Sequence, residues 1–250
     1  MAIKRYLAMT AAEIEGNPVL PLPIGWMACQ FSPYSQGLSN LPGSLPEDSL
    51  LILNDFTPID GHDPSVVGAQ LRQCIESQKC TGLLLDFQRE GNPQTEELVS
   101  FLVEALPCPV VVSEPYGANR KCPVFLPPLP HHLPLSEYLP PWQGREIWLD
   151  MAADAEVITL TEKGPQFSPP PPGETFSGGH HDPTLHCHYR MELSDTAAKF
   201  TLWRTGEDLE ALLEEAETLG VSAAVGLFQE IGQALRRDRC GIRSFAEESA

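Results

Sequence analysis

The chain has 250 residues and a formal net charge of −18, from 34 acidic and 16 basic side chains. Such a surface repels the phosphates of nucleic acids and of anionic lipids, which argues against both as partners. A hydrophobic content of 42% is enough for a substantial core, and this length suits a single α/β barrel or two smaller domains.

Cysteine usage and the N-terminal segment indicate the compartment. The seven cysteines are widely spaced and form no C-x-x-C pair, which predicts free thiols in a reducing environment. The first residues lack the continuous apolar segment of a secretory signal, and no later stretch is long enough to span a membrane. We therefore expect a cytoplasmic protein. Since no P-loop, G-x-G-x-x-G or G-x-S-x-G motif occurs, we expect no cofactor.

In the first half of the chain, strands alternate with helices. Residues 25–31 and the apolar run 50–56 predict strands, the second one buried on both faces. Asp63 and Pro64 then predict the start of a helix that ends near Lys79. The same sequence of elements follows, with a strand at 82–87, a helix opened by Asn92 and Pro93, and strands at 109–113 and 124–128. Two successive β-α-β crossovers predict a parallel sheet.

The second half is richer in strands. Residues 146–150 and 156–161 predict strands with no helix between them, and the Pro/Gly-rich segment 164–184 predicts an irregular loop. Residues 185–193 and 199–204 alternate in polarity, which predicts an antiparallel hairpin with one solvated face. Thr205 and Asp208 predict a capping box for a helix over 207–219. A strand at 223–228 and a closing helix over 229–239 complete the chain.

These elements predict one α/β domain over residues 1–250: an irregular (β/α)8 TIM-type barrel with an antiparallel β-hairpin excursion in its second half. The β-rich excursion is expected to span 146–205, with the loop 164–184 inside it. An open α/β sheet carrying a β-rich appendage is the alternative.

In such a barrel, the polar residues that follow the strands converge at one mouth. Asp86 is the strongest candidate for a ligand contact, because an almost continuous apolar run precedes it. Several carboxylates in one cleft raise one another's pKa and can act as acid and base. Loop caps or surface charges are the alternative explanation for each residue taken alone. The residues expected at the mouth are Gln30, Asp55, Asp86, Gln88, Glu114, Tyr116, Asp150, Arg204, Gln229 and Glu230.

Residues 81–88, TGLLLDFQ, resemble the D-G-x-D-x-D-x-E strand of the family-18 glycoside hydrolases, the chitinase-like group. The resemblance implies a (β/α)8 barrel. It also implies that the last Asp of the motif orients the substrate's acetamido group and that the final Glu protonates the glycosidic oxygen. Gly82 and Asp86 match the motif. Thr81 and Leu84 replace two aspartates, and Gln88 replaces the catalytic glutamate.

An amide cannot donate a proton as a carboxylic acid does, and losing general acid catalysis costs about 10²–10⁴-fold in rate. We therefore assign no catalytic residue and expect the mouth to bind a carbohydrate or another small polar ligand without efficient hydrolysis. The whole chain also resembles a family of bacterial cytosolic proteins, which implies no activity. The expected ligand-binding residues are Asp86, Gln88, Asp55, Glu114, Tyr116, Gln30 and Glu230.

Two other functions stay open. A working glycoside hydrolase could use another carboxylate, Glu114 or Glu230, as its acid. Alternatively, the hairpin and the Pro-rich loop could dock a protein partner, which an extensive apolar patch on the hairpin would favour.

Four histidines lie close together in the second half: His180, His181, His186 and His188. The last two share a strand face and could reach one Zn²⁺. The first pair falls in the Pro/Gly-rich loop and the second on the solvated face of the hairpin, so the sequence predicts solvated histidines and no metal.

Overall fold

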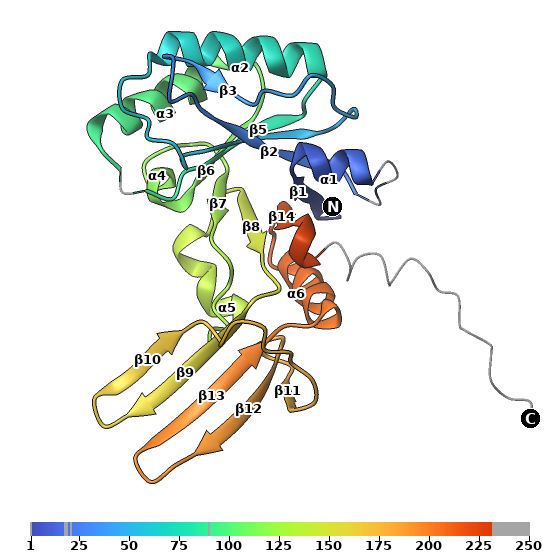
Figure 1. Cartoon of the computed structure of the whole chain (residues 1–250), viewed down its shortest axis with the longest axis vertical. Coiled ribbons are helices and arrows are strands. Elements are labelled where there is room, and N and C mark those ends of the chain that lie inside the picture. The colour runs from blue at the N-terminus through green and yellow to red at the C-terminus, as the bar shows by residue number, and fades with distance from the viewer. Residues whose placement is uncertain (1, 18–19, 21, 90, 232–250) are drawn as a thin grey trace, which may run out of the picture.

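The computed structural model describes residues 2–17, 20, 22–89 and 91–231, and among them eight parallel strands close into a barrel (Figure 1). Closure occurs at β1, which pairs in parallel with both β2 and β14. The predicted TIM-type barrel is therefore confirmed, and the open sheet is not formed. The barrel strands in chain order are β1 (Lys4–Met9), β2 (Ile24–Phe31), β4 (Leu50–Asn54), β5 (Gly82–Asp86), β6 (Val110–Ser113), β7 (Val124–Leu126), β8 (Ile147–Met151) and β14 (Ala223–Leu227).

The helices around this barrel are unequal in length, and a short strand, β3 (Leu38–Ser39), replaces the helix between β2 and β4. The long helices begin where the sequence predicts: the side chains of Asp63 and Asn92 accept the backbone N–H groups of Ser65 and Thr95. The helices are α1 (Ala11–Gly16), α2 (Pro64–Gln78), α3 (Pro93–Ala105), α4 (Glu114–Gly117), α5 (Leu135–Tyr138), the 3-10 helix η1 (Pro140–Trp142) and α6 (Gly206–Thr218).

Alternate residues of each strand pack inside and outside the barrel. Leu51, Leu83 and Leu85 face outward and pack with apolar side chains of α2 and α3. Tyr6 and Trp148 stack inside the barrel with their ring centroids 5.6 Å apart. The inner cluster consists of Tyr6, Ala8, Leu50, Ile52, Leu84, Val111, Phe125, Trp148, Ala223 and Val225. The interior is thus a packed core up to the level where the strands end.

A second sheet, the insertion sheet, lies between β8 and α6 in the chain and projects away from the barrel (Figure 1). Its strands are antiparallel in the order β10-β9-β13-β12-β11. The predicted hairpin is β12–β13 at its centre. The strands are β9 (Ala155–Thr161), β10 (Gly164–Ser168), β11 (His180–Asp182), β12 (Cys187–Leu193) and β13 (Ala197–Trp203).

Two sequence expectations about this region need correction. The excursion begins at β9 and not at residue 146, because Ile147–Met151 is a barrel strand that pairs with β7 and β14. The segment 164–184 is not irregular throughout, since β10 pairs with β9 at one end and β11 pairs with β12 at the other. Pairing partners distant in sequence supply the hydrogen bonds that local composition does not predict.

At the C-terminal end, the capping box of α6 is present: Thr205 and Asp208 exchange hydrogen bonds at its first turn. The predicted closing helix over 229–239 lies for the most part outside the described residues. None of the helices that the structure describes combines the length and the hydropathy needed to cross a bilayer.

Candidate functional site

Two aspartates point into the barrel at its mouth, the end where the carboxyl ends of the strands meet. Asp86 lies two residues after Leu84 on β5, and Asp150 lies two residues after Trp148 on β8. Because Leu84 and Trp148 belong to the inner cluster, the strand period of two turns both aspartates inward. Both side chains are half-buried. They form the polar layer above an apolar core, where (β/α)8 barrels carry their sites.

Gln88 completes the polar end of β5. Its side-chain Nε2 donates a hydrogen bond to Asp86 Oδ1 at 2.5 Å, while Gln88 itself remains exposed. Burial raises the pKa of Asp86, the hydrogen bond from Gln88 opposes this change, and the charge of Asp55 adds to it. Gln88 therefore favours the ionised form of Asp86 and supplies an amide donor and acceptor beside it.

Asp150 holds its proton more strongly. Burial and the charges of Asp86, Glu230 and Asp154 raise the pKa of Asp150 to about 7. Asp86 ionises first, and its charge then opposes the ionisation of Asp150. Near neutral pH the carboxyl group of Asp150 is thus about half protonated, and it shares the mouth with the acid Asp86 and the amide of Gln88. This set can both donate to and accept from the hydroxyl groups of a polar ligand.

Asp55 and Tyr116, both expected as ligand contacts, bind the backbone of the loop after β5. The buried carboxylate of Asp55 accepts the backbone N–H groups of Gln88 at 3.1 Å and Arg89 at 2.9 Å. The Tyr116 hydroxyl donates to the carbonyl of Arg89 at 2.9 Å, and its ring packs edge-on against Phe87. Burial raises the pKa of Tyr116, and the charges of Asp55 and Glu96 add to the rise. Both residues position Gln88.

The remaining expected residues lie at strand ends around the mouth. Gln30 is half-buried near the end of β2, beside Asn54 of β4 in the strand register. Glu114 begins α4 directly after β6, and its charge contributes to the raised pKa of Tyr138. Glu230 follows β14 and accepts the backbone N–H of Ala153 at 3.4 Å. Partial desolvation and the charge of Asp154 raise the pKa of Glu230.

Arg204 and Gln229, which were also expected at the mouth, contact other parts of the chain. Arg204 directly follows β13 of the insertion sheet and not a barrel strand, so the expectation that it closes a barrel strand is wrong. It is buried and donates to the carbonyls of Leu129 at 2.7 Å and Pro130 at 3.4 Å. Gln229 is exposed after β14, and its side chain bonds Glu13 of α1.

Sequence reasoning placed Asp150 at the mouth but left it out of the ligand-binding set, and it did not consider Tyr138. The signal for Asp150 was present, because an apolar run followed by an acid occurs in both IWLD and LLLD. Tyr138 had no such signal. Burial raises its pKa, as do the charges of Glu114 and Asp150, and its hydroxyl donates to Pro127 O at 2.9 Å.

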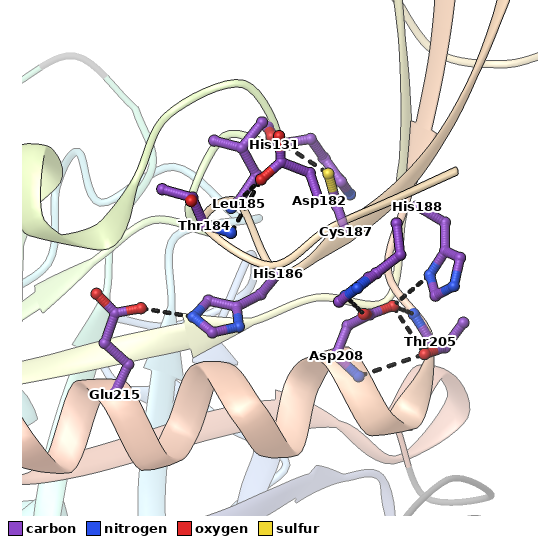
Figure 2. Close-up of polar contacts among 11 residues, drawn as sticks. His131, Asp182, Thr184, Leu185, His186, Cys187, His188, Thr205, Asp208 and Glu215 are labelled. Carbon is purple, nitrogen blue, oxygen red and sulfur yellow. Dashed lines mark hydrogen bonds and ion pairs between the residues drawn. The ribbon is translucent and has the colours of Figure 1, made fainter. Parts of the chain in front are cut away.

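The four clustered histidines are not all solvated as expected. Figure 2 shows that His186 bonds Glu215 and that His188 bonds Asp208, both acids of α6. The face of the hairpin that carries them packs against this helix, which the sequence could not indicate. Among the residues that the structure describes, no group of three or more His, Cys, Asp or Glu side chains is arranged to hold a metal ion.

Comparison with solved structures shows that this chain has the barrel fold of chitinase-like proteins. It is similar to a family-18 chitinase from Cycas revoluta in complex with (GlcNAc)3, with a TM-score of 0.62, 10% identity, and coverage of 94% of this chain and 98% of that one. A Paenibacillus barengoltzii family-18 N-acetylglucosaminidase gives a TM-score of 0.58 at 8% identity, covering 94% and 99% of the two chains. A Chromobacterium violaceum chitinase gives 0.56 at 9% identity, covering 96% and 99%.

No protein-family model and no curated protein sequence matches this chain. At these identities the similarity concerns the fold. The fold that TGLLLDFQ implies is therefore confirmed, while the function of the mouth depends on its own chemistry.

Proposed function

We propose that the barrel mouth binds a carbohydrate, of the N-acetylglucosamine class, without efficient hydrolysis. The observation that carries the proposal is the hydrogen bond from Gln88 Nε2 to Asp86 Oδ1. A carboxylate and an amide side by side can hold sugar hydroxyl or acetamido groups. The amide cannot protonate a leaving oxygen, so the general acid that the family motif places there is missing.

The structural neighbours support the choice of ligand. One of them is a family-18 chitinase solved with (GlcNAc)3, and this chain covers 98% of its length. We extend the ligand class to this chain as a proposal, with Asp86, Gln88 and Asp150 as its principal contacts. Gln30, Glu114 and Glu230 are proposed as outer contacts, while Asp55 and Tyr116 act through the loop that carries Gln88.

Thermal unfolding with and without (GlcNAc)3 tests the proposal. Ligand at about 100-fold above its Kd is expected to raise the Tm of the wild type by about 5 °C or more. Asp86→Ala is expected to abolish the rise, whereas Asp195→Ala, an exposed acid in the β12–β13 turn, is expected to keep it. The trisaccharide should be recovered intact after long incubation. No rise with the wild type would refute carbohydrate binding of this class.

A second candidate is a working hydrolase with a different acid. The observation that favours it is the pKa of about 7 at Asp150, which suits a general acid near neutral pH. Glu230, whose pKa is also raised, and Glu114 are the other candidates. If the wild type cleaves chito-oligosaccharides, Asp150→Asn, Glu230→Gln and Glu114→Gln identify the acid, since only its variant loses about 10²-fold or more in rate.

A third candidate is an interaction module, which an exposed apolar face favours. The register of the insertion sheet places Phe167 and Met191 in one row across β9 and β13, and Leu160 and Leu193 in the next. All four side chains are exposed, Leu193 at 72%. Met191→Glu is expected to leave sugar binding unchanged, so a loss of binding in this variant would count against the mouth as the site.

A further inference from the structure

The seam between the insertion sheet and the rest of the molecule is lined by histidine–acid pairs. Five of the seven histidines take part, and each lies within 4 Å of a carboxylate oxygen. The pairs are His131–Asp154, His132–Glu156, His181–Asp208, His186–Glu215 and His188–Asp208. We call these five pairs the histidine seam.

On one side, the seam joins the insertion sheet to α6. His188 Nδ1 of β12 lies 2.9 Å from Asp208 Oδ2, and His181 Nε2 of β11 lies 3.0 Å from Asp208 Oδ1. Figure 2 shows the same carboxylate bonded to Thr205 at the start of the helix, with His186 reaching Glu215 further along it at 2.5 Å. Asp208 is only 3% exposed. Two imidazole rings therefore share one buried carboxylate.

On the other side, the seam joins the sheet to the segment between β7 and α5. His132 Nδ1 lies 3.1 Å from Glu156 Oε2 of β9, and its ring packs against Phe167 of β10 at 5.0 Å between centroids. His131 is buried and lies 3.2 Å from the carbonyl of Asp154.

The apolar contacts of the two bodies are separate. Leu209, Leu212 and Leu213 fix α6 in the cluster that surrounds β8 and β14. The insertion sheet has its own small cluster around Ile158, Cys187 and Leu202. No apolar cluster of the described residues spans both bodies, so polar contacts join them: the histidine seam and the bonds from Arg204 to the carbonyls of Leu129 and Pro130.

We propose that the histidine seam is a pH-sensitive joint, which holds the insertion sheet firmly against α6 below about pH 6 and loosens it as the pH rises toward 8. Histidine is the side chain that ordinarily changes charge in this range. An imidazolium adds the attraction between opposite charges to its hydrogen bond with a carboxylate, whereas a neutral imidazole keeps the hydrogen bond alone. Loss of the imidazolium protons therefore weakens several bonds across one seam together.

Three other titratable groups at the seam keep one charge state over this range. Bonds from Thr205 and His188 outweigh burial and lower the pKa of Asp208, so its carboxylate stays ionised. Burial raises the pKa of Cys187 to about 11, so its thiol stays neutral, with Asp182 close by. Arg204 keeps its positive charge. Burial and that charge lower the pKa of His131, which favours its neutral form.

The insertion sheet is also connected to the barrel mouth through the segment between β8 and β9. Residues 152–154 connect β8 directly to β9, and within them the N–H of Ala153 bonds Glu230. The charge of Asp154 contributes to the raised pKa values of Asp150 and Glu230. A displacement of the insertion sheet therefore moves the charge of Asp154 relative to Asp150 and Glu230.

Hydrogen–deuterium exchange of the full chain between pH 5.5 and 8.5, corrected for intrinsic exchange rates, tests the joint. Peptides covering 180–189 and 203–209 are expected to lose about tenfold in protection as the pH rises, the factor expected when two or more ion pairs worth up to about 1 kcal/mol each lose the charge of their histidine. A peptide covering 82–87 of the barrel is the internal reference. A flat wild-type profile in the seam peptides would overturn the proposal.

Matched variants assign the effect to the seam. H181Q and H186Q keep an N–H donor at the position of Nε2, and H188N keeps one at the position of Nδ1, but none can become charged. The triple variant is expected to show the low protection of pH 8 at every pH. H186Q alone is expected to reduce the pH dependence of protection in the seam peptides. If the triple variant also loses protection in the barrel peptide, H186Q takes its place as the test of the proposal. H180Q changes an exposed histidine of β11 for which the described residues include no ion pair, and it should behave as wild type. An unchanged profile in H186Q, or a flattened one in H180Q, contradicts the proposal.

Discussion

Gln88 Nε2 lies 2.5 Å from Asp86 Oδ1, so the two polar side chains that follow β5 form a carboxylate–amide pair at the barrel mouth. The loop that carries Gln88 is also held by a second contact, because Asp55 accepts the backbone N–H of Gln88. The pair differs from a pair of carboxylic acids only in the amide group of Gln88.

Gln88→Glu is expected to introduce hydrolysis of chito-oligosaccharides. The new carboxyl group would lie beside Asp86 and share a proton with it, as paired carboxyl groups do. We expect a rise of about 10²-fold or more over the wild-type rate, measured by the release of reducing sugar. Gln88→Ala should stay at the wild-type background. An inactive Gln88→Glu that still binds the sugar would show that the missing acid is not what limits the wild type.

Asp150→Asn is expected to stabilise the protein at alkaline pH. The carboxyl group of Asp150 has a pKa of about 7 in the folded chain, against about 3.9 when unfolded. The unfolded state therefore loses this proton first, and stability falls as the pH rises from about 4 to 7. The difference corresponds to up to about 4 kcal/mol. Urea unfolding should show the variant about 2–4 kcal/mol more stable at pH 8 and close to the wild type at pH 4. Equal stability at both pH values would contradict the assignment.

Asp55→Ala is expected to destabilise the chain by about 2–4 kcal/mol, because two backbone N–H groups lose a buried charged acceptor. Tyr116→Phe removes one hydroxyl donor to Arg89 and should cost about 1 kcal/mol. Urea unfolding at pH 7 measures both. If Asp55 were a free ligand contact, its removal would instead leave stability unchanged and reduce sugar affinity alone.

Gly179→Ala is expected to weaken the insertion sheet. Gly179 has φ of +87°, and a Cβ there would lie 2.7 Å from the carbonyl oxygen of Tyr189 and 2.8 Å from Trp203. Backbone strain and the close approach together should cost about 2–4 kcal/mol. Gly173 has φ of +78° in open space, so Gly173→Ala isolates the strain and should cost about 1–2 kcal/mol. Thermal unfolding compares the two variants. Equal losses of stability would show that the close contact of residue 179 with Tyr189 and Trp203 is not important for the sheet.

The sequence by itself determined the long helices, most of the barrel strands and the order in which they follow one another. Asp63, Asn92 and Thr205 begin their helices as predicted, because a cap depends on atoms within three residues of chain. The apolar runs before Asp86 and Asp150 place an acid at the end of each strand, because a strand buried on both faces needs continuous hydrophobicity. The carboxylate–amide pair at Asp86 and Gln88 also follows from adjacency in the chain.

Only the tertiary structure decided which groups meet across the fold. The period of β5 and β8 turns Asp86 and Asp150 toward the barrel mouth, where burial and the charge of Asp86 raise the pKa of Asp150. Asp55 accepts two backbone N–H groups of the loop after β5, which lies 33 to 34 positions away in the chain. The histidines pair with α6, whose residues lie some 20 to 29 positions away in the chain. Each of these outcomes depends on distances between segments remote in sequence, and composition and periodicity carry no information about those distances.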